Sequence, residues 1–171
     1  VASRGLGDVY KRQYRSGNPL PRERCAPGGA IVRRVAPEPE TAYAALTHWY
    51  AQHARPLPWR ETTDPWSILV CEVMSQQTPV ARVEPVWRTW MERWPSPAHL
   101  ASASPAEVLI AWDRMGYPRR ALRLQEAAIA ITERGSFPST YTDLLALPGV
   151  GPYTAAAVVA FAFRGRSVVL D

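Results

Sequence analysis

The sequence predicts an all-α fold, and three observations support that prediction. Apolar residues recur, in segment after segment, at the three- and four-residue spacing of a buried helix face. Several of these segments open with a helix-capping residue followed by proline. No pair of alternating apolar and polar runs indicates a sheet. The 171 residues are enough to bury a core in about one domain.

Two helical segments flank a proline-rich connector at 55–60. The first begins at Glu40 and ends at this connector, where two prolines require extended backbone. The second starts with Asp64 as the N-cap and Pro65 as the first helical residue. We expect it to run to about Gln77.

The middle of the chain predicts a long helix and a short one. The long helix starts at 78–79 and carries an apolar stripe to Trp94, after which two prolines end it. A capping box at 104–107 opens the short helix, which ends near Trp112. Because the tryptophans lie mostly on such stripes, we expect them in the core.

Three helical segments complete the folded part. One follows Pro118 and ends at Gly135, the next is capped by Thr140, and the last runs from Pro152 to 164–165.

The turn Pro148–Gly151 joins the last two helices and is a candidate binding element. We expect Gly149 and Gly151 to allow positive φ and the close approach of another backbone. The N–H groups of the turn and of the next helix start can then point outward together and hold a phosphate. An ordinary αα-hairpin is the alternative.

The charge of the chain does not identify a partner. Residues 1–40 hold 8 basic and 4 acidic residues, whereas residues 41–171 hold 12 and 11, so the net charge of +5 lies mostly in the first segment. That segment is rich in Gly, Pro and Arg, and we expect it to be disordered or artefactual. No apolar run reaches the roughly 18 residues that cross a bilayer. Cys25 and Cys71 lack the spacing of a disulfide framework or zinc site, so we expect an intracellular protein.

Glu72 is a single carboxylate within the apolar stretch 68–74. Burial disfavours the charged form, and a carboxyl that stays neutral near pH 7 is a competent general acid. Gln76 lies one turn later, beside Gln77 and Thr78, so this face could hold a base. A partly exposed glutamate on an amphipathic helix is the alternative.

For two further candidate site residues, Asp171 and Tyr153, the local sequence does not decide between a functional and a structural role. Asp171 follows an apolar run and fits a catalytic carboxylate, a helix N-cap or a surface residue. Tyr153 directly follows the glycine turn, so its hydroxyl would lie near a phosphate bound there unless the ring packs in the core. The three histidines lack partners at metal-binding spacing, and we expect no metal site.

Five motifs, in this order and spacing, resemble the adenine DNA glycosylases, the MutY-type branch of the helix-hairpin-helix glycosylases. The motifs are LPWR at 57–60, CEVMSQQT at 71–78, MGY at 115–117, LPGVGPYTA at 147–155 and VLD at 169–171. The match covers about residues 41–171. It implies a helical bundle of two lobes with a DNA-binding cleft between them.

The resemblance implies a monofunctional enzyme that flips out adenine paired with guanine or 8-oxoguanine and hydrolyses its N-glycosidic bond. It gives Glu72 the role of protonating adenine and Asp171 that of stabilising the sugar cation, the two-carboxylate logic of glycoside cleavage. Tyr153 stands where bifunctional relatives carry a nucleophilic lysine. The resemblance implies that Trp59 and Arg60 form the wall of the adenine pocket and that Gln76, Gln77 and Tyr117 press into the duplex and hold it open. It implies that Gly149 and Gly151 grip a DNA phosphate, and Val150 and Thr154 are further candidates for DNA binding.

The chain departs from the family pattern at Ser75, where leucine is common, and at Pro118, where a second aromatic is common. The family pattern also continues past Asp171 with further helices, four cysteines for a 4Fe–4S cluster and a domain that reads 8-oxoguanine. We therefore expect an N-terminal fragment with a partial catalytic domain at 41–171. We expect it to bind no cofactor itself and to have little activity.

The resemblance further implies double-stranded DNA with adenine mismatches as the partner, no membrane, a monomeric state and a place in the bacterial cytoplasm with the nucleoid. Two other functions stay open. One is a bifunctional glycosylase and lyase of the endonuclease III type. The other is a non-enzymatic helix-hairpin-helix module that binds DNA.

Overall fold

The computed structural model describes residues 39–167 and shows only helices as regular elements there, as predicted. The chain divides into a unit that ends at Gln52 and a unit that begins at His53. Most of the predicted N-terminal segment 1–40 lies outside the described residues. None of the helices in the described part is long and apolar enough to span a membrane.

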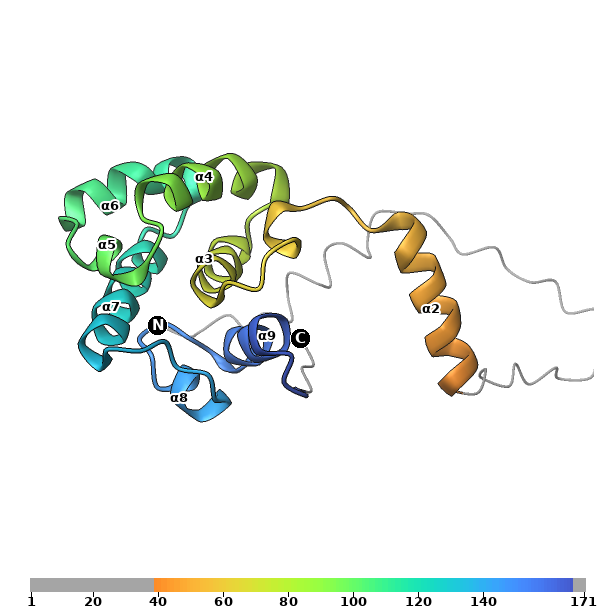
Figure 1. The fold of residues 1–171 in the computed structure, drawn as a ribbon. Helices are drawn as coiled ribbons and strands as arrows, with labels where there is room; N and C mark the ends of the chain where they lie inside the picture. Colours follow the sequence, from red (N-terminus) through yellow and green to blue (C-terminus); the bar gives the residue numbers. More distant parts are fainter. Residues whose placement is uncertain (1–38, 168–171) are drawn as a thin grey trace, which may run out of the picture. The chain divides into compact units, whose positions relative to one another are not determined.

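The first unit is described by one helix, α2 (Pro39–His53), shown in Figure 1. It begins one residue before the predicted start at Glu40 and ends two residues before the proline-rich connector. The prediction of this helix is confirmed.

The second unit contains the other elements. In chain order they are η1 (Pro58–Arg60), α3 (Pro65–Ser75), α4 (Val80–Arg93), α5 (Pro97–Ala101), α6 (Pro105–Trp112), η2 (Asp113–Met115), α7 (Arg119–Arg134), α8 (Tyr141–Leu145) and α9 (Pro152–Phe163).

The predicted helix starts are confirmed by their caps. The Asp64 carboxylate accepts a hydrogen bond from the Ser67 backbone N–H at 2.8 Å at the start of α3. At the start of α6, the Ser104 side chain accepts from the Glu107 N–H at 3.3 Å, and the Glu107 carboxylate accepts from the Ser104 N–H at 2.9 Å. Both halves of the capping box are therefore present.

Two boundaries differ from the prediction. Helix α3 ends at Ser75 rather than near Gln77, because the backbone leaves the helical region at Gln76, with ψ of 113°, and Gln77 has a φ of 53°. Helix α5 was not predicted, since Pro97 indicated only the end of the preceding helix. Pro97 is instead the first residue of α5. Proline is common at this position, although it disrupts the interior of a helix.

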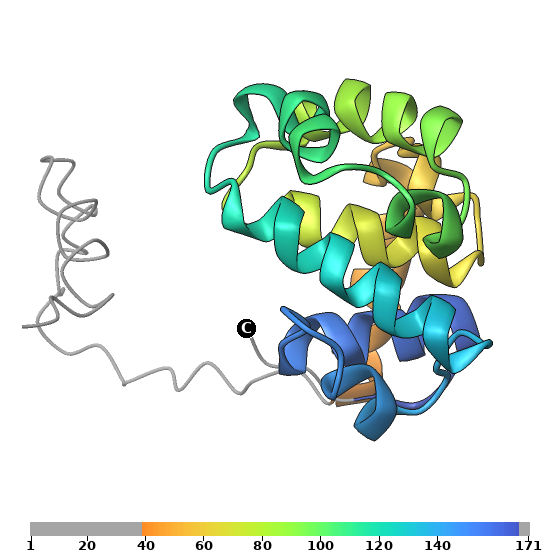
Figure 2. The same ribbon diagram turned by 90° about the vertical axis from the view of Figure 1, so that its left-hand side faces the viewer.

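Within the second unit, α3 and α7 form a middle layer between α4–α6 on one side and α8–α9 on the other (Figures 1 and 2). Seven of the 11 residues of α3 are buried, so this helix is apolar around most of its circumference. The residues of α3 that are not buried, Glu72 among them, therefore stand out as candidates for function.

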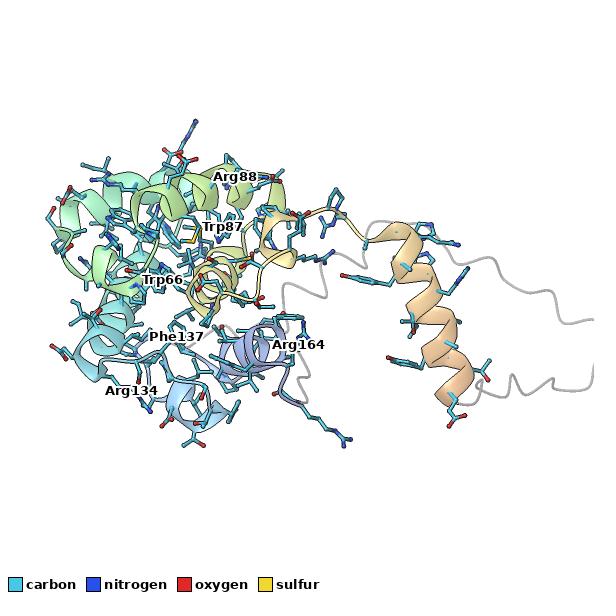
Figure 3. All side chains as sticks on the ribbon, viewed as in Figure 1. Trp66, Trp87, Arg88, Arg134, Phe137 and Arg164 are labelled. Atoms are coloured by element: carbon cyan, nitrogen blue, oxygen red, sulfur yellow. The ribbon has the colours of Figure 1, made fainter. Side chains whose placement is uncertain are left out.

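Five tryptophans lie in the core, as predicted: Trp66, Trp87, Trp90, Trp94 and Trp112. Figure 3 labels Trp66 and Trp87, whose rings lie among the packed helices. Four of the five indole N–H groups donate to backbone carbonyls at 2.9–3.0 Å. Because a buried indole N–H needs a partner, these bonds satisfy the rings in the core, and those of Trp66, Trp87 and Trp90 also link one helix to another.

Candidate active site

Glu72 is half-buried on α3, between the buried residues Cys71 and Val73. Burial raises the pKa of its carboxyl above the ordinary value. Among the residues that the structure describes, this carboxyl has no hydrogen-bond or ion-pair partner that would favour the charged form. The side chain can therefore keep its proton at higher pH than an exposed glutamate and donate it to a bound base.

Gln76 connects this face of α3 to the start of α9, the helix that follows the glycine turn. Its side-chain amide donates to the Thr154 hydroxyl at 3.3 Å, across 78 residues of sequence. Thr154 is buried in the first turn of α9, and α3 packs against α9. The structure thus brings together two of the predicted site residues, and it places the start of α9 beside the helix that carries Glu72.

Trp59 and Arg60 lie in η1, which packs against α3. The Trp59 ring is half-buried and contacts Trp87 edge to face, with ring centroids 5.6 Å apart. Arg60 is exposed, and its guanidinium donates to the Arg55 carbonyl at 3.1 Å. These positions are compatible with the predicted role in a base pocket, which stays a prediction.

Gly149 needs to be glycine for two reasons. Its φ is +75°, and a Cβ at this position would lie 2.7 Å from the Arg123 Cβ on α7. The turn therefore packs directly on α7, with Val150 buried beneath it. Both properties predicted for the glycines, positive φ and a close approach, are confirmed at Gly149.

The prediction of positive φ is wrong at Gly151. This residue has φ −90° and ψ 175°, an extended conformation that any residue adopts, and it is the N-cap of α9. A Cβ there would meet nothing within 4 Å. The absence of a side chain at Gly151 therefore leaves open space in front of the helix start rather than relieving the backbone.

The turn offers donors and a neighbouring cavity. The N–H groups of Gly149 and Gly151 have no hydrogen-bond partner within residues 39–167. A cavity of about 180 Å³ lies between the turn, the end of α3 and α7, and Gln76, Arg119 and Arg123 line it together with Gly149. Arginine side chains beside free N–H groups make this surface suitable for a phosphate.

Gln77 and Tyr117 are exposed residues in two turns, and both have a left-handed backbone, with φ of 53° and 48°. This conformation is uncommon for a residue other than glycine and is a genuine outlier for a bulky one. It costs about 1–3 kcal/mol for each residue and occurs preferentially at functional sites. Both residues were predicted to press into the DNA duplex.

Sequence reasoning missed Arg120, whose guanidinium lies between these two turns. The available signal was its register on α7. Arg120 occupies the same helix face as Leu124 and Ile131, which are buried, so it is a charged residue at a position that the helical period assigns to the core.

Of the two remaining catalytic candidates, Tyr153 and Asp171, only Tyr153 lies among the residues that the structure describes. Tyr153 lies in the first turn of α9 and is 45% exposed, so it is not a core residue. Asp171 lies outside the described residues, and its position relative to Glu72 stays a prediction. In the described part of the chain, no three His, Cys, Asp or Glu side chains form a group that could hold a metal ion.

Comparison with known proteins identifies the family. Residues 70–167 match the model of the HhH-GPD superfamily of base excision DNA repair proteins. The adenine DNA glycosylase of Mycolicibacterium smegmatis is 50% identical over 129 residues, which are 74% of this chain and 44% of that protein. The adenine DNA glycosylase of Homo sapiens is 41% identical over 138 residues, 74% of this chain and 25% of that protein. The chain thus spans less than half the length of these relatives.

A solved structure of a thermostable thymine-DNA glycosylase has the same fold, with a TM-score of 0.73 and 26% identity over 77% of this chain and 62% of that one. The family model alone covers more than half of the chain and includes α4–α9 and most of α3. These matches confirm the family and the fold that the five motifs predicted. The chain belongs to the HhH-GPD superfamily of base excision DNA repair proteins.

Proposed function

We propose that this chain carries part of the catalytic domain of a monofunctional adenine DNA glycosylase, at residues 41–171. Its substrate is double-stranded DNA in which adenine is mispaired with guanine or 8-oxoguanine. The observation that carries the proposal is the half-buried Glu72, whose pKa burial raises, on a helix that the hydrogen bond from Gln76 to Thr154 links to the start of α9.

The reaction breaks the bond between the sugar and adenine. Glu72 donates a proton to the flipped-out adenine, which then leaves as the neutral base while positive charge develops on the sugar. Water adds to the sugar carbon and loses a proton to solvent. Asp171 is proposed to stabilise the sugar cation, as the second carboxylate of a glycosidase does.

The glycine turn is proposed to hold the DNA backbone. Gly149 lines the cavity together with Arg119 and Arg123, and the N–H groups of Gly149 and Gly151 have no partner within residues 39–167, so a phosphate at the turn would accept hydrogen bonds and neutralise local positive charge. Gln76, Gln77 and Tyr117 are proposed to press into the duplex and keep the adenine extruded. Trp59 and Arg60 are proposed to form the pocket wall.

A 4Fe–4S cluster needs four cysteine thiolates. The chain has two cysteines, and one of them, Cys71, is buried in the core. These residues do not fit the cluster that the resemblance associates with the family, and we assign it no step.

The test is a single-turnover assay with this chain in excess over a duplex that contains one adenine–8-oxoguanine pair. We expect slow release of free adenine, an abasic site that breaks only on alkali treatment, and no release from Glu72→Gln. Release of thymine from a control duplex of the same sequence that carries a thymine–guanine mispair would contradict the adenine assignment. A protein–DNA adduct after borohydride treatment would show lyase chemistry, and bound but intact DNA would favour a non-enzymatic binding module.

A further inference from the structure

The turns at 76–78 and 115–117 share an unusual backbone. Gln77 and Tyr117 are both left-handed, and both are exposed at the surface. A left-handed non-glycine residue persists only when surrounding contacts determine it. The question is therefore which contacts hold two strained turns that are 40 residues apart in sequence.

The contacts come from one guanidinium group. Arg120 Nη1 donates to the end of α3, at the carbonyls of Val73 (3.0 Å), Met74 (3.3 Å) and Gln76. Its Nη2 donates to the Thr78 hydroxyl (3.1 Å) and to the carbonyls of Met115 (3.2 Å) and Gly116 (3.3 Å). One nitrogen thus serves the end of α3, and the other bridges the two turns.

Two of these acceptors matter most for the strained residues. The Gln76 carbonyl belongs to the peptide unit that precedes Gln77, and the Gly116 carbonyl belongs to the unit that precedes Tyr117. Because a peptide unit is planar, a hydrogen bond that fixes its carbonyl also fixes the N–H on the other side, and so it constrains φ of the next residue. Arg120 therefore orients both left-handed residues in the same way.

Two aromatic rings lie close to the Arg120 guanidinium. Its guanidinium lies 5.3 Å from the ring centroid of Trp112 and 5.7 Å from that of Tyr117. The Trp112 indole N–H donates to the Gly116 carbonyl at 2.9 Å, which supports the same peptide unit. Arg120 forms no ion pair with a carboxylate in the described part of the chain, so its charge is compensated by carbonyl dipoles and rings.

We propose that Arg120 is a positioning residue that sets the turns 76–78 and 115–117 relative to one another, so that Gln77 and Tyr117 enter the duplex together. The inference rests on the proposed function, in which these two residues hold the adenine out of the helix. A lysine cannot replace this arginine, because an ammonium group lacks the planar fork that reaches acceptors on two sides.

The first arm of the test needs no DNA. Hydrogen–deuterium exchange is measured for peptides that cover 76–78 and 115–117 in the wild-type chain, Arg120→Lys and Arg88→Lys. Arg88 is the matched control, because it lies exposed on α4 (Figure 3) and, within residues 39–167, its guanidinium pairs only with Glu84, at 2.9 Å. We expect exchange at least about tenfold faster in both turns of Arg120→Lys alone, given the strength of charge-assisted hydrogen bonds.

The second arm measures base opening with a duplex that carries fluorescent 2-aminopurine in place of the mispaired adenine. We expect Arg120→Lys to bind this duplex within about threefold of wild type, since the glycine turn is intact, and to lose most of the fluorescence increase. Millimolar guanidinium should restore the signal in Arg120→Ala, and ammonium should not.

The outcomes separate the two claims. Unchanged exchange in both turns of Arg120→Lys would overturn the positioning role, and so would unfolding of the whole chain, because the effect is assigned to the turns alone. Suppose that exchange in the turns is faster in Arg120→Lys, but that the wild-type chain causes no increase in 2-aminopurine fluorescence. This result would support the positioning role and contradict the proposed function.

Discussion

Glu72 combines a carboxyl group with a position in the most buried helix of its unit. Burial raises its pKa, and no partner among the described residues opposes that effect. Removing the acid while keeping its shape should therefore remove the proton donor without disturbing the helix. We expect Glu72→Gln to lower the single-turnover rate of adenine release by about 10²–10⁴-fold, the range for loss of a general acid.

The control is Glu133→Gln, at an exposed glutamate of α7, which should keep the wild-type rate. Affinity for the duplex, measured by anisotropy, should stay the same in both variants. Since the protonated form is active, the wild-type rate should also fall as the pH rises through the raised pKa. A rate that increases with pH would contradict the assignment of Glu72 as the acid.

The thiol of Cys71, the neighbour of Glu72, should be unreactive toward alkylating reagents in the folded protein. The thiol is 2% exposed, and burial raises its pKa to about 12, with a smaller contribution from the nearby Glu72. Because the thiolate is the reactive form, we expect iodoacetamide to modify Cys71 only after denaturation. Peptide mass mapping distinguishes it from Cys25, and modification of Cys71 in native buffer would show that this part of α3 opens.

How well a site residue could be predicted depended on where its partners lie. Glu72 could be found because an acid among apolar residues is visible in the local sequence. The register of Arg120 on α7 marked it as a charged residue on a buried face, but its role could not be predicted, because most of its acceptors are backbone carbonyls of α3 and of the turn before α7. The contact between Gln76 and Thr154 depends in the same way on the packing of two helices.

The glycine turn offers a test at the scale of an element, because its two glycines serve different purposes. At Gly149, alanine would need both a left-handed backbone and space that the Arg123 side chain occupies. We expect Gly149→Ala to lower the free energy of unfolding by about 1–3 kcal/mol in urea titrations. Equal stability of the variant and wild type would mean that the turn does not pack on α7 as described.

Gly151→Ala is the companion variant, with the opposite expectation. Its backbone is extended and the space before it is open, so stability should change by no more than about 0.5 kcal/mol. The added methyl group would stand where the phosphate is proposed to approach, and we expect weaker duplex binding. A variant that binds DNA like wild type would place the phosphate elsewhere.

At the scale of elements, the sequence was most informative where a helix start has local chemistry. The capping residues Asp64 and Ser104 both predicted starts that the structure confirms. Prolines were harder to interpret, because a proline is common both just after a helix ends and at the first position of the next helix, and α5 was missed for that reason. The early end of α3 could not be predicted, since it depends on the strained Gln77 and hence on Arg120.

At the scale of the whole molecule, composition and periodicity were enough for the fold class, and the order of motifs was enough for the family. None of these sequence features predicted that α3 and α7 form a layer between the other helices of the second unit (Figure 2). Each apolar stripe indicates that a face is buried but not which partner covers it. The distance between Glu72 and Asp171 is likewise a property of the assembled chain, and it stays a prediction.

The pH dependence of stability joins the site to the whole fold. Because the pKa of Glu72 is raised in the folded state, its contribution is favourable below the ordinary pKa and is lost as pH rises through the folded value. Glu107 and Asp143 have lowered pKa values, Glu107 first through hydrogen bonds from Ser104 and Asp143 first through one from Arg134. Their contributions are present above the ordinary pKa and are lost as pH falls.

Because glutamine stays neutral at every pH, Glu72→Gln avoids the loss of stability that ionisation of Glu72 causes as pH rises, and it leaves the contributions of Glu107 and Asp143 unchanged. We therefore expect this variant to have a higher Tm than wild type at pH 7, and the two to converge near pH 4, in thermal melts followed by circular dichroism. Glu133→Gln should follow wild type throughout. A lower Tm of Glu72→Gln at pH 7 would mean that the carboxylate has a stabilising partner outside the described residues. If the prediction holds, one substitution raises stability and slows excision, because the chemistry requires a half-buried acid whose ionisation at neutral pH destabilises the fold.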